Sequence, residues 1–339
     1  APSLIPTRGL EKSLDLIIKY PKNEENYDFS RAYAVHIHAF YVEDCISMID
    51  LLARVCAKVD LWLTTDSVEK KDQISAAINY KSLASFFGDV HIIVAPNGGR
   101  NVYPLLARVL PELRDYSFAL HLHTKRSSHT PRGAMWCADL INCLVADVAH
   151  VNKICAAFEG NPSLGLILPR CPEEIRSFWN WGKNFEMAQL LCRNAFPGRS
   201  LHITAPLIFP AGMMFWFRPQ SLQGLHDMIR LWDKPPYEPL PADGTYLHAI
   251  ERLVVHSCEA AGFDWCLCCP PSEYPLLTES SAASISVWQQ RVDEYVQATS
   301  YLAASLRELD EKQRIYQELK NNLIWKLAEP FRAARRRFR

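Results

Sequence analysis

The sequence predicts an α/β fold: a mostly parallel β-sheet flanked by helices, with a helical extension at the C-terminal end. Three observations lead to this prediction. Short apolar runs alternate with amphipathic stretches through most of the chain. Polar and basic residues directly follow several of the apolar runs, as they do where strands end. The composition then changes, from about residue 284, to a long polar stretch of helical character.

The apolar runs of the first half predict four strands, each followed by a helical stretch. The strands are expected at residues 33–40, 59–65, 89–95 and 116–123, and the helices at 43–57, at 68–78, from about 103 and at 135–158. Alternation of this kind favours right-handed crossovers and a parallel sheet with helices on both faces.

The second half is less regular. A fifth strand is expected at 164–168, an irregular aromatic stretch at 170–210, a further strand at 211–217 and a helix at 244–261 with Asp243 as its N-cap. We divide the chain into a lead-in at 1–30, an α/β domain at 31–283, a helical extension at 284–328 and a basic amphipathic tail at 329–339. The extension could form a coiled coil that makes the chain a homo-oligomer.

The composition narrows the classes of function. The 339 residues carry a formal net charge of zero, which gives no sign of nucleic acid as a partner. Eleven cysteines are scattered along the chain, many of them in apolar runs, which favours free thiols and a cytoplasmic location. No apolar run reaches 18 residues and no signal peptide is visible.

The strand at 116–123 leads into a cluster of imidazole and basic side chains. His121 and His123 alternate on this strand, and Lys125 and Arg126 follow its carboxyl end. Open α/β sheets bind ligands at that edge, and two cations could neutralise a diphosphate without a metal. His121 and His123 could instead hold Mn²⁺ or Mg²⁺. A solvated basic loop is the simplest alternative.

The first two strands also end in polar residues. His36 and His38 point to one face of the first strand and could contact a base or ribose, with hydrogen-bonded core histidines as the alternative. Thr65 and Asp66 close the second strand, and we assign them to the same nucleotide-sugar site.

A glycine turn, Asn97-Gly98-Gly99-Arg100-Asn101, follows the third strand. Gly99 would let the backbone approach a ligand, and the next helix offers free N–H groups to an anion. We assign Arg100 and Asn101 to this ligand, and a tight turn without function is the alternative. The spacing is not G-x-G-x-x-G, so it does not predict a dinucleotide fold.

Further candidates lie in the C-terminal half. Gly212 could leave room for a sugar, and Trp216 offers an aromatic face to an acceptor, although core packing is the alternative for the aromatic residues. Asp243 could act as the general base on an acceptor hydroxyl, or it could only cap its helix.

The helix after Asp243 adds three polar side chains. His248 and Arg252 lie one turn apart, and we assign both to the acceptor. Glu251 is the second candidate base, or it merely pairs with Arg252.

Taken together, these stretches resemble the rhamnan synthesis F family of bacterial polysaccharide glycosyltransferases. The matching pieces are Val35–Tyr41, Asp60–Asp66, Asn97–Leu106, Leu120–Ser128 with Trp136, Gly165–Pro169, Ala211–Arg218 and Asp243–Arg252. The resemblance implies a GT-A-type fold, a Rossmann-like sheet with a nucleotide-sugar site at its carboxyl edge. It also implies transfer of rhamnose or galactofuranose, from a donor such as dTDP-rhamnose or UDP-galactofuranose, to a cell-surface polysaccharide such as O-antigen.

Two departures from the family pattern matter. The family usually carries Gly-Arg-Asp where this chain has Gly99-Arg100-Asn101, and the Asp-x-Asp motif common in GT-A enzymes is missing. His121-x-His123-Thr124-Lys125 occupies the corresponding strand end. We therefore expect a metal-independent, inverting enzyme with Asp243 as base. A retaining enzyme and a catalytically silent scaffold are the alternatives.

The C-terminal tail resembles the ends of modules in multidomain polysaccharide glycosyltransferases. Aromatic and basic residues are mixed over 325–339, which favours an anionic membrane surface as partner, with a disordered basic tail as the alternative. A lipid-linked glycan acceptor would suit such docking. We therefore expect the protein at the inner face of the cytoplasmic membrane.

Overall fold

The computed structural model describes residues 33–56, 58–125, 131–171, 179–203, 207–230, 234–241 and 243–272, together with Lys312 and Ile315. Its centre is a seven-stranded sheet in the order β3-β2-β1-β4-β6-β5-β7, in which only β6 is antiparallel to its neighbours. The strands are β1 (Tyr33–His38), β2 (Asp60–Thr65), β3 (Val90–Val94), β4 (Phe118–His123), β5 (Leu164–Pro169), β6 (Phe215–Phe217) and β7 (Asp264–Cys268). The predicted mostly parallel sheet flanked by helices is confirmed.

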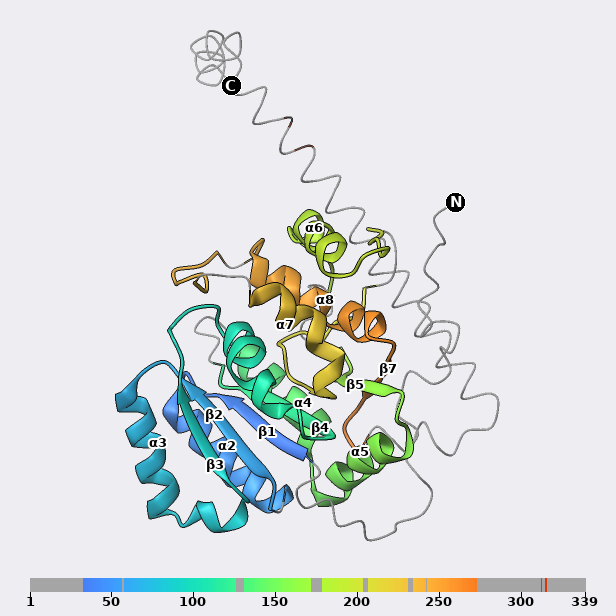
Figure 1. Ribbon diagram of the computed structural model, residues 1–339. Coiled ribbons are helices and arrows are strands. Elements are labelled where there is room, and N and C mark those ends of the chain that lie inside the picture. Colours follow the sequence, from blue (N-terminus) through green and yellow to red (C-terminus); the bar gives the residue numbers. More distant parts are fainter. Residues whose placement is uncertain are drawn as a thin grey trace, which may run out of the picture.

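Helices cover both faces of this sheet. They are α2 (Val42–Val55), α3 (Val68–Tyr80), α4 (Pro131–Val145), α5 (Val148–Gly160), α6 (Phe185–Ala195), α7 (Gln223–Ile229) and α8 (Tyr246–Ala260). Short turns of other helix types are η2 (Leu83–Phe86), η3 (Pro104–Val109), η4 (Leu110–Leu113) and η6 (Pro219–Leu222). In Figure 1, α6, α7 and α8 gather above the sheet, and α3 and α5 lie in the lower part of the view.

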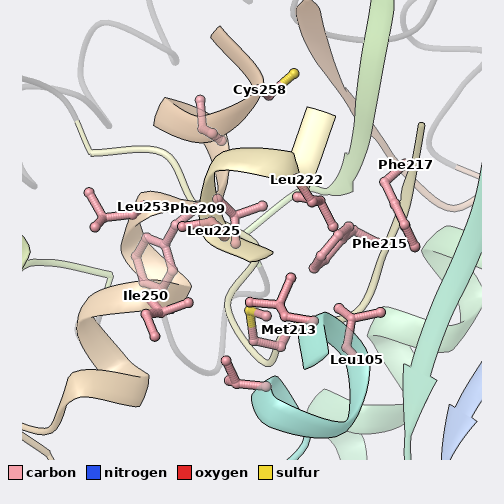
Figure 2. Close-up of a cluster of buried hydrophobic side chains, with 14 of the residues drawn as sticks. Leu105, Phe209, Met213, Phe215, Phe217, Leu222, Leu225, Ile250, Leu253 and Cys258 are labelled. Carbon is pink, nitrogen blue, oxygen red and sulfur yellow. The ribbon is translucent and has the colours of Figure 1, made fainter. Parts of the chain in front are cut away.

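Strand alternation divides the buried side chains into two cores. On β1, Tyr33, Val35 and Ile37 join a core with α2, α3, α4 and α5. Ala34, between them, joins the other core with η3, α6, α7 and α8. Figure 2 shows part of this second core, in which Phe215 of β6 lies among side chains of η3, α7 and α8. His36 and His38 alternate with the first set and therefore face the second core.

Arg218 ties the amino ends of the central strands together. Its guanidinium donates to the carbonyl oxygens of Leu164 at 2.8 Å, Ser117 at 2.9 Å and Phe158 at 2.5 Å. These carbonyls belong to the start of β5, the approach to β4 and the end of α5. A single side chain thus satisfies acceptors that the strand ladders leave open.

Several predicted boundaries need correction. The helix expected at 135–158 is two helices, because Asp147 accepts from His150 N at 2.8 Å and caps a new start for α5. The strand expected at 211–217 is only three residues long, since Gly212 and Met213 adopt φ of 89° and 52°. Strand β7 and helices α6 and α7 were not predicted.

The predicted lead-in, helical extension and tail fall outside the described residues, apart from Lys312 and Ile315. The division of the chain into these segments stays a prediction.

Candidate active site

The candidate site lies at the carboxyl ends of β1 and β4, where the strand order changes direction. The chain runs outward from β1 through β2 to β3, whereas β4 pairs with the opposite side of β1. Open α/β sheets bind their ligands in the crevice outside such a switch point. His38 and His123 end the two strands here, and Thr124 and Lys125 follow.

Four histidines form a polar row across the ends of these strands. His36 and His121 lie in register, with their Nδ1 atoms 3.0 Å apart. The Thr64 hydroxyl on β2 lies 3.0 Å from both His36 Nε2 and His38 Nδ1. His123 Nε2 lies 2.5 Å from the Gly212 carbonyl oxygen, which can only accept, so this nitrogen carries the proton.

Burial keeps the row neutral. It lowers the pKa of His38 to about 3 and that of His123 to about 4. It also holds the pKa values of His36 and His121 well below the ordinary range. The four histidines therefore offer hydrogen-bonding groups without charge, and positive charge for a diphosphate falls to other residues.

Among the described residues, a metal at His121 and His123 finds no third ligand. Within these ranges, no group of three or more His, Cys, Asp or Glu side chains is placed to hold a metal ion. His121 Nδ1 and His123 Nε2 contact His36 and Gly212, whereas His121 Nε2 is buried with no hydrogen-bond partner in the same ranges. A divalent metal at this pair stays a prediction.

Thr65 and Asp66 act differently from each other at the end of β2. Thr65 Oγ1 donates to the Ala39 carbonyl oxygen at 2.9 Å and so holds two strand ends together. Asp66 pairs with Lys70 at 2.7 Å. Both of these charges lie close enough to His38 to affect its pKa. Asp66 therefore lies near the four histidines, whereas Thr65 links the end of β2 to the backbone after β1.

The glycine turn packs against the proline segment, residues 234–241. Gly98 pairs with Tyr237 in an isolated antiparallel bridge, and Gly99 N donates to the Pro236 carbonyl oxygen at 2.7 Å. A Cβ on Gly98 would approach this segment to 3.0 Å. The glycines thus make room for protein where the sequence predicted room for a ligand.

Arg100 continues this contact toward α8. Its Nε donates to Glu238 Oε1 at 2.8 Å, and one terminal nitrogen lies 3.4 Å from the carbonyl oxygens of Leu240 and Pro241. The other terminal nitrogen lies 3.4 Å from His248 Nε2. A diphosphate that bound Arg100 would therefore replace the Glu238 carboxylate.

Asn101 stands where the resemblance leads one to expect aspartate. Its backbone carbonyl accepts from Leu105 N at 3.3 Å, and its side-chain Nδ2 is buried without a hydrogen-bond partner among the described residues. A buried amide donor without an acceptor is costly. Asn101 therefore follows Arg100 in the glycine turn with a side-chain amide that donates to no described acceptor.

Lys125 is a half-buried cation directly after β4. Its Nζ lies 3.5 Å from the centroid of the Trp136 ring on α4. Burial lowers the pKa of Lys125, and attraction by Glu251 opposes that shift. Lys125 thus provides positive charge at the switch point, on an aromatic support.

Gly212 connects the strand end with α4 and α8. Its N–H donates to Glu251 Oε1 at 2.8 Å, and its carbonyl oxygen accepts from His123. With φ at 89°, a Cβ would lie 3.1 Å from Trp136. Backbone conformation and packing therefore require this glycine, rather than the volume of a sugar.

Helix α8 brings three polar side chains to the same place. Glu251 Oε2 lies 3.6 Å from the guanidinium of Arg252, which also donates to the His248 carbonyl oxygen at 2.9 Å. His248 Nδ1 lies 2.7 Å from Thr245 Oγ1. Because Arg100 can only donate to His248 Nε2, the imidazole proton lies on Nδ1. Burial, with the two nearby arginines, lowers the pKa of His248.

Asp243 holds a turn in place and does not cap α8. The cap is Thr245, whose hydroxyl accepts from His248 N. Asp243 Oδ1 accepts from Asn184 Nδ2 at 2.6 Å and Oδ2 from Lys183 N at 3.1 Å. Burial raises the pKa of Asp243, but these hydrogen bonds outweigh it and the pKa is lowered. Both carboxylate oxygens of Asp243 accept hydrogen bonds from the protein, which suits a structural role better than that of a general base.

Trp216 does not join this group. Trp216 is fully buried in the core formed with α2, α3, α4 and α5, and its Nε1 donates to the Leu144 carbonyl oxygen at 3.1 Å. Strand alternation places it on the opposite face from Phe215, so the predicted acceptor role is corrected to core packing. Arg126 lies outside the described residues.

Sequence reasoning missed several participants, among them Thr64, Glu238, Asn184 and Thr245. Glu238 holds Arg100, and the run of prolines around it was the available signal of a rigid segment. Asn184 binds Asp243, and nothing in the sequence marks it.

No single described helix is long and apolar enough to cross a membrane. The stretches Met135–Val145 and Val148–Gly160 meet the length and composition test together, but they are bent by 61° where they meet.

Comparison with known proteins gives a family match and two relatives. The model of the family described as rhamnan synthesis protein F matches residues 11–263, which is more than half of the chain. The chain is 26% identical over 228 residues to an uncharacterized protein, WxcX, of Xanthomonas campestris pv. campestris strain B100, and equally to WxcX of strain ATCC 33913. The match covers 66% of this chain and 31% of each relative, so the chain spans about a third of their length.

Proposed function

We propose that this chain, which belongs to the rhamnan synthesis protein F family, is a GT-A-type glycosyltransferase module. Membership implies a part in the synthesis of rhamnan or a related polysaccharide. One observation carries the finer proposal. The half-buried cation Lys125 lies within electrostatic range of the Glu251 carboxylate near the switch point of the sheet, where an anionic leaving group and a proton could both be accepted.

A nucleotide sugar is the proposed donor. Lys125 is placed to neutralise its diphosphate, and Arg100 would add a second cation on exchanging Glu238 for phosphate. Asp66 and His38 would face the nucleoside from the ends of β2 and β1. The family description supports dTDP-rhamnose as donor, and UDP-galactofuranose is the second candidate.

Glu251 takes the role of general base that the sequence assigned first to Asp243. In the proposed reaction the acceptor hydroxyl oxygen attacks the anomeric carbon of the donor in a single displacement. The hydroxyl proton passes to Glu251, and the bond to the diphosphate breaks with its electron pair on the leaving oxygen. Lys125 stabilises the charge that develops there, without a metal. The product is inverted at the anomeric carbon.

The proposed location and assembly of the protein follow from the nature of its acceptor. A growing, lipid-linked glycan is the proposed acceptor, with His248 and Arg252 nearby. We propose that the basic tail at 329–339 docks the protein on the inner face of the cytoplasmic membrane, and that the extension at 284–328 makes a homo-oligomer.

Thermal unfolding of the 339-residue chain with UDP, dTDP and GDP, and with their sugar conjugates, tests the donor site. Ligand at 100 times its Kd stabilises by about 2.7 kcal/mol, so one nucleotide is expected to raise Tm by a few degrees, with or without Mn²⁺. Lys125→Met should abolish that shift, and Glu251→Gln should keep it.

A matched control is Lys81→Met, which removes a lysine at the far end of α3. It should leave the nucleotide shift intact. The absence of a shift with any nucleotide would refute the enzyme proposal and favour the scaffold.

A further inference from the structure

Three buried histidines and one threonine form a single hydrogen-bonded chain across β2, β1 and β4. His38 Nδ1 lies 3.0 Å from Thr64 Oγ1, which also lies 3.0 Å from His36 Nε2. His36 Nδ1 in turn lies 3.0 Å from His121 Nδ1. We propose that Thr64, His36 and His121 are positioning residues that fix His38 as a hydrogen-bond donor, whose Nε2–H binds an oxygen of the nucleotide sugar. This inference rests on the proposed function.

Each hydrogen bond of this chain needs one proton, so the proton positions depend on one another. Burial keeps the three imidazoles neutral near pH 7, because it lowers the pKa of His38 to about 3 and holds the pKa values of His36 and His121 well below the ordinary range. A neutral imidazole carries a proton on one nitrogen and a lone pair on the other, and the Thr64 hydroxyl has one proton to donate. The chain therefore has two complete proton arrangements, which run in opposite directions.

The buried end of the chain decides between the two directions. His121 is fully buried, and its Nε2 has no hydrogen-bond partner among the described residues. A proton on this nitrogen would leave a buried N–H without an acceptor, which is rarer in folded proteins than an acceptor without a donor. The proton of His121 therefore lies on Nδ1, which donates to His36 Nδ1. His36 Nε2–H then donates to Thr64 Oγ1, and the Thr64 hydroxyl donates to His38 Nδ1.

The accessible end of the chain is His38, the last residue of β1. Its exposed fraction is 8%, whereas His36 and His121 are 0% exposed. Because His38 Nδ1 accepts from Thr64, the single proton of this imidazole lies on Nε2. A nucleotide sugar presents acceptor oxygens in its base, its ribose and its phosphates, and an N–H at the switch point can bind one of them. The opposite proton arrangement would place a lone pair against the same oxygen and weaken binding.

The proton positions can be measured without a ligand. Long-range 1H–15N correlation NMR of the 339-residue chain, labelled with 15N-histidine and kept in EDTA near pH 7, distinguishes protonated from unprotonated ring nitrogens. His38 is assigned by the signals that disappear in His38→Leu, and His121 by contacts of its ring protons with Phe215, whose ring centroid lies 6.0 Å away. We expect a protonated Nε2 on His38 and a protonated Nδ1 on His121. A proton on His38 Nδ1 or on His121 Nε2 would overturn the inference.

Variants of Thr64 test the link between the chain and the nucleotide. Thr64→Val removes the hydroxyl and should weaken binding of the nucleotide that raises Tm by about five-fold, the loss expected for one hydrogen bond. Thr64→Ser keeps the hydroxyl and should stay within about two-fold of wild type. Because Thr64 acts through His38, Thr64→Val should cause no further loss of affinity in the His38→Leu background. Thr65→Val removes a neighbouring buried hydroxyl outside the chain and should leave the proton positions of His38 and His121 unchanged.

The two measurements separate this inference from the proposed function. The expected proton positions, together with a loss of affinity in Thr64→Val that depends on His38, support the inference. Full nucleotide affinity in His38→Leu, or an equal further loss from Thr64→Val in that background, would refute the role of His38 in binding. If no nucleotide raises the Tm of wild type, the donor proposal is refuted, whereas the proton positions still confirm or refute the hydrogen-bonded chain.

Discussion

The buried histidine row predicts a steep loss of stability in mild acid. In the folded chain, burial lowers the pKa of His38 to about 3 and that of His123 to about 4, against an ordinary value of 6.5. An unfolded histidine titrates near that ordinary value. Between pH 6.5 and pH 4 the unfolded state therefore binds more protons, so the free energy of unfolding falls as the pH falls.

The size of the effect follows from these pKa values. At pH 5.0 an unfolded imidazole is protonated about 30 to 1, whereas the folded ones stay mostly neutral, which costs about 2 kcal/mol for each residue relative to pH 7.5. His38 and His123 together remove about 4 kcal/mol, a large share of the roughly 5–15 kcal/mol that keeps a protein folded. His36 and His121 act in the same direction.

Urea unfolding followed by tryptophan fluorescence at pH 7.5, 6.5, 5.5 and 5.0 measures this loss. The midpoint should fall at each step. His38→Gln should be less stable at pH 7.5, because its bond to Thr64 changes, but its loss between pH 7.5 and 5.0 should be about 2 kcal/mol smaller than in wild type. The exposed His202→Gln is the matched control and should keep the wild-type slope. A urea midpoint that stays constant down to pH 5.0 would refute the conclusion that the four buried histidines are neutral in the folded chain.

Four further predictions concern single residues. Gly212→Ala should destabilise the fold by about 3 kcal/mol, because the glycine has a positive φ and its added Cβ would contact α4. The control Gly198→Ala, at φ 82° with open space around it, should cost about 1 kcal/mol. Equal urea midpoints for the two variants would contradict this reasoning. Arg218→Met should lower stability by about 3 kcal/mol because the carbonyl oxygens of Leu164 and Ser117 lose the guanidinium donor, measured in the same way. Glu251→Gln should abolish product formation, seen by chromatography of the glycan, but keep the nucleotide shift. Asp243→Asn should lower Tm and keep measurable transfer, and complete loss of transfer in a folded Asp243→Asn would restore Asp243 as the base.

Sequence periodicity was sufficient for β1 to β5, but it missed β7 and did not give the length of the short strand β6. Apolar runs followed by polar residues predicted β1 to β5, and most of these strands are buried on both faces. The run at 211–217 is equally apolar, yet the positive φ of Gly212 and Met213 confines the strand to its last three residues. Backbone conformation of this kind follows from contacts with α4 and α8, which are distant in sequence. For the same reason the face of Trp216 could not be predicted.

The candidate site was predicted in outline, and the roles within it were not. Chain order was enough to place His38, His123 and Lys125 at one edge, because parallel strands end on the same side. Which side chain binds which group depends on segments that meet only in the fold. Asp243 is hydrogen-bonded to Asn184, and Arg100 to Glu238, and no local sequence pattern predicts either contact.

The packing of the glycine turn against the proline segment has a consequence for the design of hybrid proteins. Gly98 and Gly99 pack closely against Pro235 and Pro236, so the two segments form one unit although three of the seven strands, β4, β5 and β6, lie between them in the chain. Hybrids between relatives are commonly cut near the middle of a domain. A cut between these segments would join a turn from one parent to a loop from another, and we expect such hybrids to express poorly. Exchange of both segments together should keep this contact intact.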